Sequence, residues 1–202
     1  AALDAGGLTL ASVQDDAPYT YAGANGKSVN NYDRRYRGFT TLREAITDSI
    51  NIVTVKTLAQ AGVSLGWQYV QEYGFTTVDS RDMNEALALG GITQGVSNLE
   101  LTAAYAAIAN QGTYIRPKFY TKILDHDGNV LIDNTTPESH TVIKDTTAWL
   151  LTSAMEDVMT SGTGTSAYFG SSMAQAGKSG TTTSSRDALF AGYTPYYTCA
   201  VW

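Results

Sequence analysis

The sequence of 202 residues is poor in charge, and it contains a single cysteine and two histidines. Charged residues make up 16% of it, against about 25% in average soluble domains. The net charge of −6 argues against nucleic acid as a partner, because a phosphate backbone is bound by clustered Lys and Arg. Cys199 cannot form an intrachain disulfide, and we expect it to be a small buried strand residue. His126 and His140 are too few for a zinc framework. We expect both at the surface, with no metal and no cofactor.

No apolar run approaches the roughly 20 residues of a membrane-spanning helix, so we expect no membrane segment in this chain. The start, AALDAGGLTL, also lacks the charged region and apolar core of a signal peptide. Residues 1–5 are typical of the last turn of a helix that ends at Gly6 and Gly7. Residues 197–202 form a strand-like run that stops without a turn. These two patterns predict a domain that is incomplete at both ends.

Helix-start signals divide the first two-thirds of the chain. Residues 7–39 are predicted to be mostly irregular, with a turn at 23–26. Thr41-Leu-Arg-Glu44 and Ser97-Asn-Leu-Glu100 are capping boxes, which place a hydroxyl and a carboxylate on the free N–H groups of a helix start. The first box opens a helical pattern that reaches about residue 61, interrupted at 49–51. The second opens a helix that ends near residue 110. Two further helices are predicted, at 64–73 and 145–159, the latter with Trp149, Leu150, Ala154 and Val158 along one side.

Strand-like patterns dominate the rest. Residues 118–124 and 129–133 flank Asp125-His-Asp-Gly128 and are typical of a hairpin. Three more strands are predicted at 173–180, 187–193 and 197–202. Helices come first and strands last, without regular βαβ alternation. This order favours an α+β fold with an antiparallel sheet.

Two short motifs could carry chemistry, and the first is Lys178-Ser-Gly180. A phosphate-binding loop is one interpretation, but it requires a glycine where Ser172 stands. The alternative is an edge strand on which Gly180 lets a ligand lie close to the backbone as an added strand. Lys178 would then supply a positive charge, and the hydroxyls of Ser179 and Thr181 would bind a carboxylate. Such a K-T-G-like element occurs in penicillin-recognising serine enzymes together with S-x-x-K and S-D-N.

The second motif is Ser49-Ile-Asn51, which lies at the interruption of the helical pattern. On a turn between helices, its hydroxyl could relay a proton and its amide could bind a substrate carbonyl. Both residue types also cap helices, so a purely structural role is the alternative.

The combined motifs resemble the transpeptidase domain of class A penicillin-binding proteins, the bifunctional peptidoglycan synthases. The resemblance covers most of the chain. It extends from Asn31-Tyr-Asp-Arg-Arg-Tyr-Arg-Gly38 and Thr41-Leu-Arg-Glu-Ala45 to Leu89-Gly-Gly-Ile-Thr-Gln-Gly-Val-Ser97, Thr160-Ser-Gly-Thr-Gly-Thr165 and Ala191-Gly-Tyr-Thr-Pro195. It implies a serine β-lactamase/D,D-peptidase-like fold, in which helices flank an antiparallel sheet and an all-helical lobe carries Ser49 and Asn51. Residues 1–202 would be part of one such domain.

The resemblance also implies a role for each site residue. Ser49 would shuttle a proton at the leaving group, and Lys178 would hold the Ser49 hydroxyl. Asn51 would bind the amide of the acyl donor. Ser179, which stands where Thr is commoner, and Thr181 would bind the donor carboxylate. Gly180 would lie against the donor strand, and the Thr181 N–H would form half of an oxyanion hole.

One family element is absent from this sequence. No serine in it has a lysine three residues later, so the S-x-x-K nucleophile would lie upstream of residue 1. We therefore expect residues 1–202 alone not to acylate. Two functions remain open: part of a D,D-transpeptidase, or a non-catalytic binding or scaffold module of the same fold. The resemblance implies peptidoglycan stem peptides, β-lactam antibiotics and the upstream segment as partners. It implies a place in the cell envelope, at the outer face of the cytoplasmic membrane.

Overall fold

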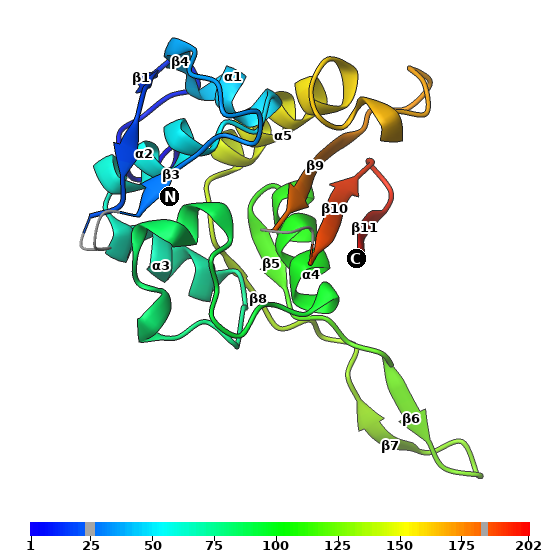
Figure 1. Ribbon diagram of the computed structural model, residues 1–202. Coiled ribbons are helices and arrows are strands. Elements are labelled where there is room, and N and C mark those ends of the chain that lie inside the picture. The colour runs from blue at the N-terminus through cyan, green and yellow to red at the C-terminus, as the bar shows by residue number, and fades with distance from the viewer. Residues whose placement is uncertain (23–26, 183–185) are drawn as a thin grey trace.

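The structure is a computed structural model that describes residues 1–22, 27–182 and 186–202. The turn predicted at 23–26 lies outside the described residues. Figure 1 shows a largely helical region on one side of the molecule and a three-stranded sheet on the other, with α5 (Asp145–Thr160) passing between them. This arrangement of helices around an antiparallel sheet agrees with the expected α+β class.

The helical region contains α1 (Leu42–Thr47), α2 (Asn51–Ala61) and α3 (Val63–Glu72), followed by the short 3₁₀ helices η1 (Ser80–Asp82) and η2 (Glu85–Leu89). The predicted capping box at Thr41 is present, with both of its hydrogen bonds. The predicted interruption at 49–51 is confirmed as the junction between α1 and α2. Apolar side chains from both sides of that junction form one buried cluster: Leu42, Ala45, Ile50 and Val53. The junction is therefore anchored in the core.

The segment before α1 is more regular than predicted. β1 (Val13–Asp16) pairs antiparallel with β4 (Gly38–Thr41), and β2 (Tyr19–Thr20) pairs with β3 (Ser28–Val29). These strands are short and mostly polar, so they lack the alternation of apolar residues by which a strand is recognised in a sequence. The pairing brings Asp16 opposite Gly38.

The main sheet has the order β11-β10-β9 and is antiparallel throughout. Its strands are β9 (Ala176–Thr181), β10 (Ala188–Tyr193) and β11 (Thr198–Val201), close to the predicted ranges. Helix α4 (Asn98–Ala109), which begins at the predicted capping box on Ser97, packs against β10 and β11, and α5 packs against β9. Among the described residues, β9 pairs only with β10, which makes it an edge strand.

Two further ribbons and a short helix complete the chain. β5 (Thr113–Ile115) pairs with β8 (Ser139–Thr141), and η3 (Thr165–Ala167) follows α5. The predicted hairpin is present as β6 (Lys122–Leu124) and β7 (Val130–Asp133), and it projects from the body of the molecule (Figure 1). Within the described ranges, no helix is both long and apolar enough to cross a membrane.

Two predictions of side-chain burial were wrong. Trp149 was expected on the packed side of its helix but is 69% exposed, whereas Ala154 and Val158 of the same predicted side are buried together with Ala148 and Met155. Cys199 is exposed on β11 and not buried. Residues 1–5 form one hydrogen-bonded turn, in which the Ala5 N–H donates to the Ala1 carbonyl at 2.9 Å, and this agrees with the last helical turn predicted there. His126 and His140 are exposed, as predicted.

Candidate active site

The turn that carries Ser49 ends α1 in an unusual way. The Ile50 N–H donates to the Ala45 carbonyl at 2.9 Å, and the Ser49 N–H donates to the Ile46 carbonyl at 3.4 Å. This is the pattern of a Schellman motif, whose left-handed position is most often glycine. Here that position is Ser49, with φ of +56°. A side chain in this conformation costs about 1 kcal/mol, and backbone strain of this kind concentrates at functional sites.

The Ser49 hydroxyl is held by a lysine from the main sheet. Lys178 Nζ donates to Ser49 Oγ at 2.7 Å and to its neighbour, the Ser179 carbonyl, at 2.9 Å. Burial lowers the pKa of Lys178 from 10.5 to about 8, because a desolvated ammonium is disfavoured against the neutral amine. The structure therefore brings the predicted pair of Ser49 and Lys178 within hydrogen-bonding distance.

Asn51 is the first residue of α2, and its side chain is tied to the preceding loop. Its Nδ2 donates to the Asn30 carbonyl at 2.9 Å. An amide nitrogen carries two protons, so this bond occupies one of them. Asn51 lines the same cleft as Ser49, and its amide can therefore still donate to a ligand carbonyl.

The loop after α5 supports strand β9 at the cleft. Ser179 Oγ donates to Thr163 Oγ1 at 3.1 Å, and the Thr163 N–H donates to the Thr47 carbonyl at 3.2 Å. The neighbouring Gly162 allows this approach, because a Cβ there would lie only 2.2 Å from the Thr47 carbonyl oxygen. Thr163 thus links the end of α1 to β9, and it is a site residue that the sequence reasoning did not assign.

A cavity of about 590 Å³ lies between the helical region and the edge of β9. It brings together five of the six predicted site residues, namely Ser49, Asn51, Ser179, Gly180 and Thr181, while Lys178 reaches it through its bond to Ser49. A Cβ built on Gly180 would meet no atom within 4 Å. The strand backbone is thus open to a ligand at that point, as the sequence indicated.

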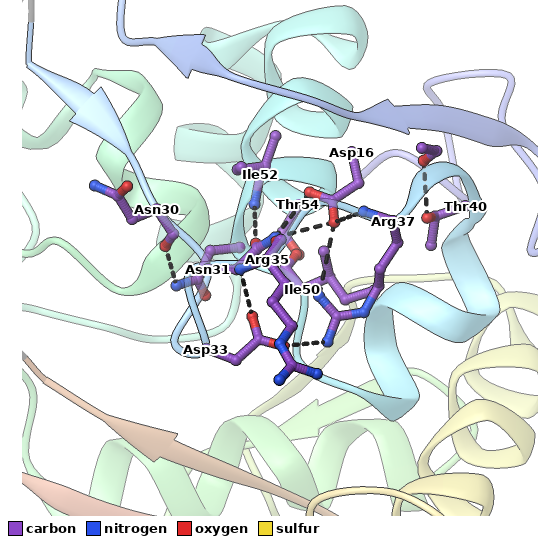
Figure 2. Close-up of polar contacts among 12 residues, drawn as sticks. Asp16, Asn30, Asn31, Asp33, Arg35, Arg37, Thr40, Ile50, Ile52 and Thr54 are labelled. Carbon is purple, nitrogen blue, oxygen red and sulfur yellow. Dashed lines mark hydrogen bonds and ion pairs between the residues drawn. The ribbon is translucent and has the colours of Figure 1, made fainter.

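The cleft has a second wall that sequence reasoning missed. Asn31, Tyr32, Asp33 and Arg37 line it. Figure 2 shows how this loop is held from inside: the buried carboxylate of Asp16 accepts hydrogen bonds from Asn31 and from the Arg37 backbone, and Arg37 also pairs with Asp33 at 2.9 Å. The signal for these residues is the segment Asn31–Gly38, which carries part of the family resemblance but contains no motif that by itself indicates chemistry.

The phosphate-loop interpretation of Lys178-Ser-Gly180 is wrong. These residues lie within β9 and pair with Ala191, Phe190 and Leu189 of β10. A phosphate loop instead wraps its backbone N–H groups around the ligand at the start of a helix. An extended edge strand cannot form that cradle, but it can pair with a peptide-like ligand.

With this geometry established, comparison with known proteins shows what the chain is similar to. All of residues 1–202 match the family described as the penicillin binding protein transpeptidase domain. Penicillin-binding protein 1F of Bacillus subtilis (strain 168) is 40% identical over 178 residues, which cover 85% of this chain and 24% of that protein. Penicillin-binding protein 1A of Clostridium perfringens (strain 13 / Type A) is 34% identical over 212 residues, which cover 100% of this chain and 31% of that protein.

Solved structures show the same fold. The crystal structure of penicillin-binding protein 1A from Haemophilus influenzae matches with a TM-score of 0.83 and 27% identity, covering 95% of this chain and 34% of that one. Penicillin-binding protein A from Mycobacterium tuberculosis, solved as an imipenem acyl-enzyme complex, matches with a TM-score of 0.82 over 97% of this chain and 49% of that one. At 18% identity, the second match concerns the fold alone. The chain spans less than a third of the length of the Bacillus subtilis and Clostridium perfringens relatives.

Proposed function

Because this chain belongs to the penicillin-binding protein transpeptidase family, we propose that it forms most of the cleft of a D,D-transpeptidase that cross-links peptidoglycan stem peptides. Residues 1–202 would be one part of that transpeptidase domain, with the nucleophilic serine supplied by an upstream segment of the same protein. The observation that carries the proposal is the 2.7 Å bond between Lys178 and Ser49. It joins the two predicted motifs at one cavity.

The reaction would proceed through an acyl-serine intermediate. The serine oxygen attacks the carbonyl carbon of the penultimate D-Ala, and the bond to the terminal D-Ala breaks. The proton that the nucleophilic serine loses passes through the lysine of the upstream S-x-x-K and Ser49 to the departing amine, while Lys178 holds the Ser49 hydroxyl in place. An amine of a neighbouring stem peptide then attacks the serine ester and forms the cross-link, and the proton that this amine loses returns along the same path to the serine oxygen. Because a β-lactam contains the same kind of carbonyl in a strained ring, it would acylate the same serine.

The remaining residues would bind and orient the donor. An extended stem peptide adds to the open edge of β9 beside Gly180, where the structure leaves room for it. The hydroxyls of Ser179 and Thr181 receive its terminal carboxylate, and the Lys178 charge draws that carboxylate toward the strand. Asn51 binds the donor amide. The Thr181 N–H contributes half of the oxyanion hole.

The cellular setting follows from the proposed substrate. Peptidoglycan stem peptides lie outside the cytoplasmic membrane, so we place the protein in the cell envelope at that outer face. The anchor would lie outside residues 1–202. β-Lactam antibiotics would be its inhibitors.

The second candidate is a binding or scaffold module of the same fold without catalysis. The conformation of Ser49 favours the enzyme. A module that only binds has no need for a strained serine at a position that suits glycine, nor for a half-buried lysine bonded to its hydroxyl.

Intact mass after exposure to benzylpenicillin tests the proposal. The protein is compared in two lengths: residues 1–202, and the same chain extended upstream by about one pair of helices, long enough to include the S-x-x-K serine. We expect one adduct on the longer protein and none on the shorter one. A folded longer protein without an adduct would favour the binding module. An adduct on residues 1–202 would mean that a serine within this sequence is the nucleophile.

A further inference from the structure

We propose that Asn31, oriented by the buried carboxylate of Asp16, is a positioning residue that fixes Asn51 at the start of α2. This inference rests on the proposed function, because it assigns Asn51 to the acyl donor. It concerns the contacts that Asn31, in the cleft loop 30–37, makes with Asp16 and with the start of α2. Figure 2 shows the cluster.

The start of α2 has no local cap. Ile50 occupies the N-cap position and offers no side-chain acceptor. In contrast, α1 and α4 begin with complete capping boxes from their own neighbouring residues. At α2 the acceptor comes from far along the chain: Asn31 Oδ1 accepts the Ile52 N–H at 3.2 Å across 21 residues. The helix that presents Asn51 is thus capped by the cleft loop.

The Asn31 side chain has only one workable orientation. Its Nδ2 donates to Asp16 Oδ1 at 2.8 Å, to Asp16 Oδ2 at 3.0 Å and to the Arg35 carbonyl at 2.8 Å. A flipped amide would place Oδ1 against that carboxylate and Nδ2 against the Ile52 N–H. Both contacts would be repulsive. Asp16 therefore dictates that the oxygen of Asn31 points at α2.

Asp16 is itself rigidly held. Its side chain is fully buried, and its Oδ2 accepts the Arg37 N–H at 2.9 Å and lies 3.7 Å from Arg37 Nη1. A buried carboxylate that loses its partners is strongly destabilised, so these bonds are made together or not at all. The cluster therefore connects the cleft loop to the start of α2 through the bonds of Asp16 and Asn31.

The same loop also contacts the functional side chain directly. The Asn30 carbonyl accepts from Asn51 Nδ2, while Asn31 holds the backbone at Ile52, one residue beyond. Adjacent loop residues therefore fix both the side chain of Asn51 and the helix turn that carries it. Loss of Asn31 would free the loop and let the Asn51 amide drift from the donor amide. A misplacement of about 1 Å is sufficient to slow an enzyme markedly.

The test uses the longer protein described above and two acyl donors that differ in the feature Asn51 would recognise. Benzylpenicillin carries a side-chain amide, whereas 6-aminopenicillanic acid has a free amine there. For Asn31→Ala we expect the second-order acylation rate to fall about tenfold for benzylpenicillin and by less than about twofold for 6-aminopenicillanic acid. In an Asn51→Ala background, Asn31→Ala should cause no further loss. Equal losses for both donors, or an undiminished loss in that background, would overturn the proposal.

A matched control separates positioning from stability. Asp82 on η1 is another buried carboxylate, and it accepts from the Thr93 N–H at 2.8 Å and the Thr93 hydroxyl at 2.6 Å outside the cleft. Asp16→Asn and Asp82→Asn should both lower the melting temperature. Only Asp16→Asn should change the ratio of the acylation rates with the two donors. If Asp82→Asn changes it equally, the effect of Asp16 is one of general stability and the inference fails.

One readout does not require acylation. Hydrogen exchange of the Asn51 Nδ2 proton that is bonded to the Asn30 carbonyl, followed by NMR, should be faster in Asn31→Ala than in the parent protein, and Asp82→Asn should leave it unchanged. If the parent is never acylated but this pattern holds, the proposed function fails while the positioning role stands. If acylation is normal and the exchange is insensitive to Asn31, the positioning role fails alone.

Discussion

The side-chain nitrogen of Lys178 lies 2.7 Å from the hydroxyl oxygen of Ser49, although 129 residues separate them in the sequence. Each belongs to a short motif that is common by chance. Their contact joins the edge strand β9 to the turn between α1 and α2. The resulting cleft is lined by Ser49, Asn51 and the open edge of β9 at Gly180.

The charge of Lys178 predicts how acylation depends on pH. Burial lowers its pKa to about 8, so the ammonium is progressively lost as pH rises through that value. We expect the apparent affinity for benzylpenicillin to fall over the same range, because its carboxylate loses the positive charge at β9. Acylation rates of the longer protein at several concentrations and pH values give this directly. The Lys178→Met variant should bind benzylpenicillin weakly at every pH and show no such fall in affinity. If the same fall occurs in this variant, another group is responsible for it.

Stability should depend on pH in the opposite sense. Since the pKa of Lys178 is near 8 when folded and 10.5 when unfolded, the unfolded chain binds more protons between these values. Stability therefore rises with pH across the window. The rise in stability should be clearest between pH 8 and 10. Above pH 10 two tyrosines have the opposite effect on stability, because burial raises the pKa of Tyr105 and Tyr193 to about 12. The melting temperature of residues 1–202 should rise over pH 8–10, and this slope should be smaller in Lys178→Met.

The strained backbone at Ser49 predicts an unusual order of stabilities. Ser49→Gly and Ser49→Ala both remove the hydroxyl that Lys178 holds, but only glycine relieves the left-handed φ of +56°. We expect Ser49→Gly to be more stable than Ser49→Ala by about 1 kcal/mol. Both should lose most of the acylation rate in the longer protein. Urea denaturation of the two variants measures the difference, and equal stabilities would show that the turn carries no strain.

Two glycines of β9 provide a matched pair. At Gly180 an added Cβ meets open space, whereas at Gly177 it would lie 2.6 Å from Phe190 Cζ. We expect Gly180→Ala to melt within a few degrees of the parent and to acylate at least about tenfold more slowly, since the methyl occupies the place of the ligand. Gly177→Ala should mainly lower the melting temperature. If Gly180→Ala retains full acylation, the ligand does not lie along this edge.

Substitutions of Ser179 test the contribution of its hydroxyl, at a position where the family resemblance implies that threonine is commoner. Its Oγ donates to Thr163 Oγ1 at 3.1 Å, and a threonine keeps that group while adding one methyl at a half-buried position. We expect Ser179→Thr to acylate within about threefold of the parent, and Ser179→Ala to lose about tenfold or more through weaker carboxylate binding. Kinetics with benzylpenicillin distinguish the two. Equal rates for all three proteins would remove Ser179 from the binding site.

Local signals predicted much of the helical region and the main strands. The hydroxyl of Thr41 and the carboxylate of Glu44 lie within one helical turn of each other, so their pairing depends on few other residues. The same holds for Ser97 and Glu100. The break at Ser49 was also visible, because polar residues interrupt an apolar pattern there.

The elements that failed depend on distant partners. Trp149 fits an apolar helix face by spacing, but the face that α5 buries is set by where β9 and α1 lie against it. Strands β1 and β4 are paired with each other although more than 20 residues separate them in the sequence, and their own composition is too polar to indicate this pairing. Cys199 is small and apolar, yet it lies on an exposed position of β11.

By itself the sequence determined the class of fold and the helix starts, since these follow from composition and from contacts within a few positions. The candidate residues Ser49, Asn51 and Lys178 came from short motifs together with the resemblance to a known family. The tertiary structure supplied the contact of Lys178 with Ser49 that the resemblance implied, and it alone decided that Thr163 holds Ser179 and that Asn31 caps α2 beside Asp16. Such contacts join residues that the chain keeps far apart. Their geometry depends on the packing of every element between them, and no local pattern encodes it.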